Sequence, residues 1–140
     1  MSDFLLQRAA TRNPDNGKAR LAEYQTLELD FEHDSTALTL HIPATAADPI
    51  LVLNVILRIV DNFTGDADET LNVGDGVTPD AFIDELDIDV TAVNAIAQSL
   101  NKDNAKSMGW YYVADGSIVV TIGGAPTDGT GKLIAEIIRL

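Results

Sequence analysis

Residues 24–32 read YQTLELDFE, and from Leu27 onward apolar and acidic side chains alternate without a break. A period of two is that of a β-strand, in which successive side chains point to opposite faces of a sheet. One face carries Leu27, Leu29 and Phe31, whereas the other carries only carboxylates. We therefore predict a strand with one buried face and one solvated face.

The same period recurs along the rest of the chain in short runs bounded by Pro, Gly or Asp. These runs span residues 38–42, 50–60, 70–73, 110–113, 117–122 and 132–140. Many short strands without regularly alternating helices are typical of an antiparallel β-sandwich. We predict an all-β protein of the jelly-roll or Greek-key type, with one or two short helices.

Some segments need a local interpretation. Residues 110–113 and 117–122 flank the turn Ala114-Asp115-Gly116, which predicts a β-hairpin. Residues 132–140 fit helical as well as strand spacing, but the preceding loop at 123–131 and the shortness of the run favour a strand. The region around residues 92–100 favours a helical turn or a short helix.

The run at residues 50–60, ILVLNVILRIV, is apolar on both faces of a strand. Such a strand needs cover on both sides, and in a domain of this size one cover can be another subunit. We predict that the core is lined by Leu51, Leu53, Val55, Leu57 and Ile59. The opposite face mixes apolar groups with an amide and a guanidinium, which suits an interface with a polar centre. The candidate oligomer-interface residues are Val52, Asn54, Ile56 and Arg58.

The composition excludes several classes of function. The 140 residues, 46% of them hydrophobic, are enough for one domain with a real core. With 22 acidic and 9 basic residues, the net charge of −13 repels nucleic acid. The absence of cysteine excludes disulfides, thiolate metal sites and cysteine nucleophiles. No run is long and apolar enough for a bilayer, and no signal-peptide pattern opens the chain, so we expect no membrane partner and synthesis in a cytoplasm.

The first residues differ in charge from the rest of the chain. Residues 1–20 hold four basic and two acidic side chains, and Asn13-Pro14-Asp15-Asn16-Gly17 is a concentrated turn signal. We predict an extended N-terminal arm over residues 1–22 and a sandwich domain over residues 23–140. A frayed terminus with a short helix is the alternative. The candidate arm contacts are Phe4, Leu5, Arg8 and Arg12.

No motif supports catalysis or a cofactor. The stretch ending in Lys132 resembles a phosphate-binding loop, but Pro126 replaces its first glycine and Leu133 replaces its hydroxyl residue. The carboxylates at 84–89 carry no sign of the burial that an acid–base pair needs. We predict no enzyme and no cofactor.

The acidic stretch 61–76 raises the question of calcium. Asp66, Asp68 and Thr70 have the spacing of a helix-flanked calcium loop, but Leu71 stands at its required glycine. We predict a solvated loop and no metal ligands, with a looser strand-loop calcium site as the alternative.

Trp110, Tyr111 and Tyr112 form the main aromatic concentration. A strand with rings on both faces commonly packs one into the core and the other under a loop or partner. We favour this structural role. The alternative is a carbohydrate-binding module in which Trp110 and Tyr112 stack on sugar rings.

From Tyr24 onward, the order of elements resembles a group of small tailed-bacteriophage virion proteins with a jelly-roll-like sandwich. The pieces that carry the resemblance are YQTLELDFE, TLHIP, ILVLNVILRIVDNF, TLNVGDGVTPDAF, WYYVADGSIVVTI and TDGTGKLIAEIIRL. The TLNVGD strand and the closing GTGKL strand are the most distinctive. The basic N-terminal stretch has no counterpart in this pattern.

The resemblance implies a structural virion protein of the head decoration, or cement, type. Such a protein would bind the major capsid protein or other virion subunits and would assemble with itself as a homotrimer. It would be located in the virion after assembly in the host cytoplasm. A neck or tail component is the alternative position, and the resemblance implies no catalytic residue.

Overall fold

The computed structural model describes residues 23–65, 68–102 and 104–140. Two short 3-10 helices, η1 (Glu85–Asp87) and η2 (Ser99–Asn101), accompany the strands. The strands are β1 (Glu23–Glu32), β2 (Thr39–Ile42), β3 (Ile50–Thr64), β4 (Thr70–Gly74), β5 (Ile96–Gln98), β6 (Trp110–Tyr112), β7 (Gly116–Gly123) and β8 (Asp128–Arg139).

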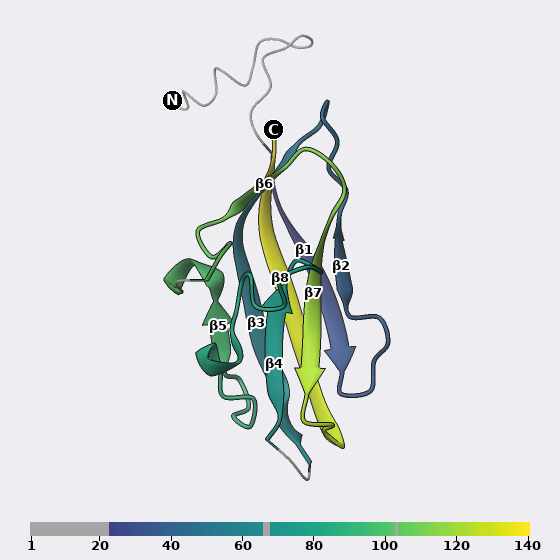
Figure 1. The fold of residues 1–140 in the computed structure, drawn as a ribbon, viewed down its shortest axis with the longest axis vertical. Coiled ribbons are helices and arrows are strands. Elements are labelled where there is room, and N and C mark those ends of the chain that lie inside the picture. The colour runs from purple at the N-terminus through teal and green to yellow at the C-terminus, as the bar shows by residue number, and fades with distance from the viewer. Residues whose placement is uncertain (1–22, 66–67, 103) are drawn as a thin grey trace.

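The strands form two antiparallel sheets that pack face to face. The large sheet has the order β1-β8-β3-β5, and β6 also pairs with β3. The small sheet has the order β2-β7-β4. Figure 1 shows β4 and β7 crossing in front of β3 and β8, so that the two sheets make the two layers of a sandwich.

The strand pairing is that of a jelly roll. β1 pairs with β8, β2 with β7, and β3 with β6, so strands from opposite ends of the chain lie together. From β1 to β4 the chain alternates between the large and the small sheet. This is a long antiparallel ribbon rolled into a sandwich. The predicted all-β, jelly-roll type of sandwich is confirmed.

One local prediction is wrong. Residues 110–112 and 116–123 do not form a hairpin, because β6 joins the large sheet and β7 joins the small sheet. The helical turn or short helix predicted around residues 92–100 is present as η2, which begins at Ser99, whereas β5 occupies the centre of that range. In a jelly roll, strands that are neighbours in sequence tend to lie in opposite sheets, and local sequence patterns do not encode that choice.

The core lies between the two sheets, and its aromatic end explains the glycines of β8. The Phe31 and Phe63 ring centroids are 6.1 Å apart. A Cβ on Gly131 would lie 2.5 Å from Phe31 Cζ, and one on Gly129 would lie 2.5 Å from Phe63 Cγ. Part of the predicted loop at 123–131 is therefore strand, with glycine where a phenylalanine ring needs the space.

Candidate interaction surface

A β-bulge in β3 decides which side chains leave the core. Val52 is opposite Ile137 on β8, whereas Asn54 is opposite Glu136, so two residues of β3 face one residue of β8. A bulge of this kind shifts the alternation of side chains by one position. Before the bulge the even-numbered residues of β3 are buried, and after it the odd-numbered residues are buried.

The shift corrects the predicted division of β3 into two faces. Leu51 and Leu53 lie outside the core, whereas Val52 is fully buried within it. The odd-numbered residues beyond the bulge line the core as predicted, as do Leu27, Leu29 and Phe31 on β1.

The side of the large sheet that is turned away from the small sheet is called the outer face below. The registers of β3 with β5, β6 and β8 place apolar side chains from four strands on it. Ile96 and Tyr111 are 57% and 51% exposed. The apolar members of the outer face are Leu51, Leu53, Ile56, Ile96, Tyr111, Ile134 and Ile138.

A row of polar side chains crosses this face at the bulge. Asn54 Nδ2 donates to Glu136 Oε1 and to Gln98 Oε1, each at 3.0 Å. Glu136 Oε2 accepts a hydrogen bond of 2.7 Å from the Tyr24 hydroxyl. Asn54 Oδ1 accepts bonds from the Ser99 hydroxyl and the Leu100 N–H. The row therefore ties β1, β8, β3 and β5 together with partners inside the chain.

Charged side chains occupy the next part of the outer face. Lys132 Nζ lies 3.0 Å from Glu28 Oε1 and 3.8 Å from Asp30 Oδ1. The hydrogen bond to Glu28, followed by the charges of the two acids, raises the pKa of Lys132 above its usual value. Arg58 donates to Asn94 Oδ1 at 2.9 Å. This region keeps polar groups at the surface beside the apolar side chains.

A cluster of contacts around Lys106 lies beside the aromatic strand β6. The Lys106 ammonium lies 4.2 Å from the centre of the Trp110 ring and 2.7 Å from Asp75 Oδ2. Burial acts to raise the pKa of Asp75, but Lys106 and the N–H groups of residues 77 and 78 outweigh it and lower that pKa to about 2. Burial, and then the charge of Asp75, raises the pKa of Tyr112 to about 12. The ion pair between Lys106 and Asp75 connects the segment before β6 to the turn after β4.

The three aromatic residues of β6 have different surroundings. The Tyr112 ring packs on Gly116, where a Cβ would lie 2.3 Å from its Cε1 atom. Tyr111 shares the outer face with Leu51, and Trp110 is 44% exposed. A shallow hollow of about 370 Å³ is lined by Leu51, Met108, Gly109, Trp110 and Tyr111. Trp110 and Tyr112 therefore do not form one open aromatic platform.

The four candidate interface residues have separate places. Val52 lies in the core and is unavailable to a partner, because the bulge reverses the predicted parity. Asn54 is 2% exposed, and its hydrogen-bond partners lie on β8, β5 and η2 of the same chain. Ile56 and Arg58 lie on the outer face. The arm candidates Phe4, Leu5, Arg8 and Arg12 lie outside the described residues.

Sequence reasoning missed the contribution of β8 to the outer face. Ile134 lies opposite Ile56 in the register, and Ile138 lies opposite Leu51. The run at 132–140 is apolar on both faces of a strand, which is the signal that could have identified them.

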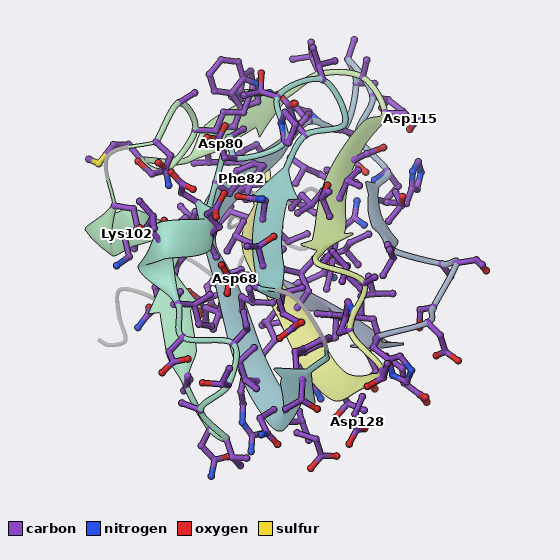
Figure 2. All side chains as sticks on the ribbon, turned by 60° about the horizontal axis from the view of Figure 1, so that its bottom comes forward. Asp68, Asp80, Phe82, Lys102, Asp115 and Asp128 are labelled. Carbon is purple, nitrogen blue, oxygen red and sulfur yellow. The ribbon has the colours of Figure 1, made fainter. Side chains whose placement is uncertain are left out.

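The residues considered for other chemistry have structural roles. Lys132 is part of β8, and its ammonium pairs with Glu28 and Asp30. Asp87 Oδ2 accepts bonds from the Asp84 N–H and the Asn104 amide, which stabilises the turn at η1. Asp115 and Asp128 lie at opposite ends of the molecule (Figure 2).

Two searches confined to the described ranges gave negative results. In residues 23–65, 68–102 and 104–140, no group of three or more His, Asp or Glu side chains is arranged to hold a metal ion. No helix in the same part of the chain is long and apolar enough to cross a membrane.

The fold and the outer face define an all-β jelly-roll protein in which, among the described residues, one apolar sheet face stays partly exposed. No protein-family model matches this chain, and no curated protein matches it. Solved structures do match the fold of this chain. The chain is similar to one in the capsid asymmetric unit of cyanophage Pam1, with a TM-score of 0.60 and 16% identity over 94% of this chain and 95% of that chain.

A second similar chain belongs to the acidic stable capsid structure of Helicobacter pylori bacteriophage KHP30. The TM-score is 0.56 and the identity 14%, over 84% of this chain and 87% of that chain. At these identities the similarity establishes a shared fold. Because both chains are covered almost completely, the shared fold is the whole jelly roll rather than one motif.

Proposed function

We propose that this protein is a structural component of a phage virion, namely a capsid decoration or cement protein that binds and stabilises the head as a homotrimer. The observation that carries the proposal is the outer face, an apolar surface that stays partly exposed among the described residues, on a jelly roll similar to chains of two phage capsid structures. Its partners would be further copies of itself and the major capsid protein or other virion subunits. Its location would be the virion, after assembly in the host cytoplasm.

The chemistry of the outer face suits contact with protein. Ile56 and Ile134 lie next to each other at its centre, with Ile96 at the edge. Ile56 and Ile134 are half-buried and Ile96 is exposed. Contiguous apolar side chains that stay accessible beside polar neighbours are a feature of protein interfaces. Complete burial of an exposed aliphatic side chain contributes about 1.5–3 kcal/mol before the costs of ordering, and the half-buried Ile56 and Ile134 would each contribute less. Arg58 and Lys132 would supply polar groups within that contact.

The proposed role is structural and involves no catalysis, nucleic acid or membrane. The acidic side chains of the η1 turn stabilise the loop after β4, and the glycines of β8 accommodate core rings. The strong negative charge favours a protein surface over nucleic acid as the partner.

A second candidate function is carbohydrate binding on the virion surface. The hollow beside Trp110 and Tyr111 favours it, since exposed rings next to a shallow depression can stack on sugars. Tyr112 would not take part, because its ring packs on Gly116. The outer face would remain unexplained by this function.

The proposal is tested by adding labelled protein to purified heads, and separately to purified tails, of the phage whose genome carries the gene. We expect the native chain to sediment with heads at a fixed number of copies per head. Ile56→Asp/Ile134→Asp should not sediment with them, whereas Thr39→Asp/Thr121→Asp, on the outward side of the small sheet, should. Sedimentation with tails alone would favour a neck or tail component. Binding to neither, together with a Trp110-dependent affinity for sugars, would favour the carbohydrate module.

A further inference from the structure

A row of charged side chains crosses the outer face on three neighbouring strands. Asp30 of β1 lies opposite Lys132 of β8, and Lys132 lies opposite Arg58 of β3. The Lys132 ammonium is 3.0 Å from Glu28 but 3.8 Å from Asp30. The Asp30 side chain is 82% exposed. Lys132 is therefore held chiefly by Glu28, and the Asp30 carboxylate is open to a second cation.

Arg58 is a cation of this row with a neutral partner, because its guanidinium donates to Asn94 Oδ1 at 2.9 Å. Within residues 23–65, 68–102 and 104–140, Arg58 has no ion pair, unlike the other lysines and arginines, which are Lys102, Lys106, Lys132 and Arg139. The positive charge of Arg58 acts to lower the pKa of Lys132, so these two cations repel each other. A further acid would therefore stabilise the outer face at Arg58.

Asp30 and Arg58 are directed to opposite borders of the large sheet. β1 lies at one border and β5 at the other (Figure 1). The Asn94 N–H donates to the Ile59 carbonyl on the β5 side of β3, so the Arg58 guanidinium that binds Asn94 points away from β1. Asp30 lies two strands from Arg58, about 10 Å across the sheet. The two charges fit each other but point to different neighbours.

A cyclic trimer uses two unlike borders of this kind. Each copy contacts one neighbour through one patch and the other neighbour through a different patch. A threefold axis parallel to the strands of the large sheet brings the β1 border of one copy to the β5 border of the next, with no shift along the strands. Each row of the outer face then meets the same row of the next copy, so that the apolar row of Ile56 and Ile134 also meets itself.

We propose that Asp30 of one copy binds Arg58 of the next copy, so that three such ion pairs close the ring of the homotrimer. The occupant is a second copy because the two complementary charges lie in one row, at opposite borders of the same face. In a face-to-face dimer with a twofold axis along β8 and β3, Lys132 would instead lie over the like charge of Arg58. Charge complementarity of this kind fixes the register of a contact more than its affinity.

This inference rests on the homotrimer proposed above and adds the residues that set its register. It is tested on the full-length protein by measuring the concentration at which the oligomer is half dissociated. Asp30→Arg and Arg58→Asp each place like charges in the contact and should raise that concentration about tenfold or more. Asp30→Arg/Arg58→Asp restores opposite charges and should return it close to the native value.

Two matched controls test the register and the place of the contact. Glu32 is the next acid on the same face of β1, so Glu32→Arg/Arg58→Asp should restore the oligomer less than the exchange at Asp30 does. Asp115 is exposed on the turn before β7, and Asp115→Arg/Arg58→Asp should restore nothing. If Arg58→Asp does not fold, Arg58→Gln keeps a donor for Asn94. Its effect and that of Asp30→Asn should then be non-additive in a double-mutant cycle.

The outcomes separate this inference from the proposed function. Native association in both single variants, or no recovery in the exchanged pair, would overturn the contact between Asp30 and Arg58 and leave the homotrimer standing. Equal recovery with Glu32→Arg would overturn the register. A native mass of two chains would overturn the ring, and a native chain that stays monomeric at all concentrations would overturn the proposed self-association as well.

Discussion

Asn54 Nδ2 donates a hydrogen bond of 3.0 Å to Glu136 Oε1, at the point where the bulge in β3 faces β8. The same amide reaches Gln98 on β5, and Glu136 also accepts from Tyr24 on β1. The polar centre of this face is therefore satisfied inside one chain. It fixes the register of the large sheet and leaves the surrounding apolar side chains as the groups that need a cover.

Asn54 should matter for stability and not for association. Asn54→Ala would leave polar groups of Glu136 and the Leu100 N–H without their partner, so we expect the free energy of unfolding to fall by about 1–3 kcal/mol. Urea denaturation measures this change, with the exposed Thr39→Ala as a control that should have little effect. Dissociation of the oligomer without a loss of chain stability would assign Asn54 to the interface instead.

The pairing of Phe31 with Gly131 makes a second stability prediction. A Cβ on Gly131 would lie 2.5 Å from the Phe31 ring, so Gly131→Ala should destabilise the fold by about 1–3 kcal/mol through overpacking. In Phe31→Leu the ring is gone, and the same glycine substitution should then have a smaller effect. A double-mutant cycle measures this coupling. Equal effects of Gly131→Ala in both backgrounds would show that the ring is not the reason for the glycine.

Asp75 should make the stability depend on pH in the acid range. Its pKa is about 2 in the folded protein and 3.8 ordinarily, so its contribution is complete above about pH 4 and is lost as the pH falls towards 2. Asp75→Asn keeps an oxygen for the N–H groups of Val77 and Thr78 but loses the charge facing Lys106. We expect the variant to be less stable by about 1–2 kcal/mol at pH 7. The difference in unfolding free energy should vanish near pH 2, and a difference independent of pH would contradict the assignment.

Removal of the N-terminal arm should separate folding from assembly. We expect deletion of residues 2–20 to leave the strand signal in circular dichroism unchanged, because the core of the described residues lies between the two sheets of the predicted sandwich domain. The measured oligomer should be weaker, since the arm would no longer reach a neighbouring chain. If the truncated protein fails to fold, the arm is part of the core and the division at residue 22 is wrong.

The sequence was most informative where its alternation was clear. In β1 every apolar residue from Leu27 to Phe31 alternates with an acid, and these side chains face the core as predicted. In β3 both parities are apolar, so the shift at Leu53 and Asn54 leaves no trace in the pattern. The faces beyond the bulge were assigned correctly, and those before it were reversed.

Local sequence patterns also do not predict which distant strands pair with each other. The short connection between β6 and β7 has the composition of a hairpin turn, yet the chain changes sheets there. The glycines at 129 and 131 were read as loop residues, because their reason lies in Phe31 and Phe63, far away in sequence. Such features depend on what packs against a segment rather than on the segment itself.

The mass of the protein in solution, measured by light scattering during size-exclusion chromatography, tests the role of the outer face most directly. The native chain should have three times the mass of one chain. Ile56→Asp/Ile134→Asp should have the mass of one chain and an unchanged circular dichroism spectrum, while Thr39→Asp/Thr121→Asp should remain a trimer. If the outer-face variant is folded and still has three times the chain mass, this face is not the surface through which the copies associate.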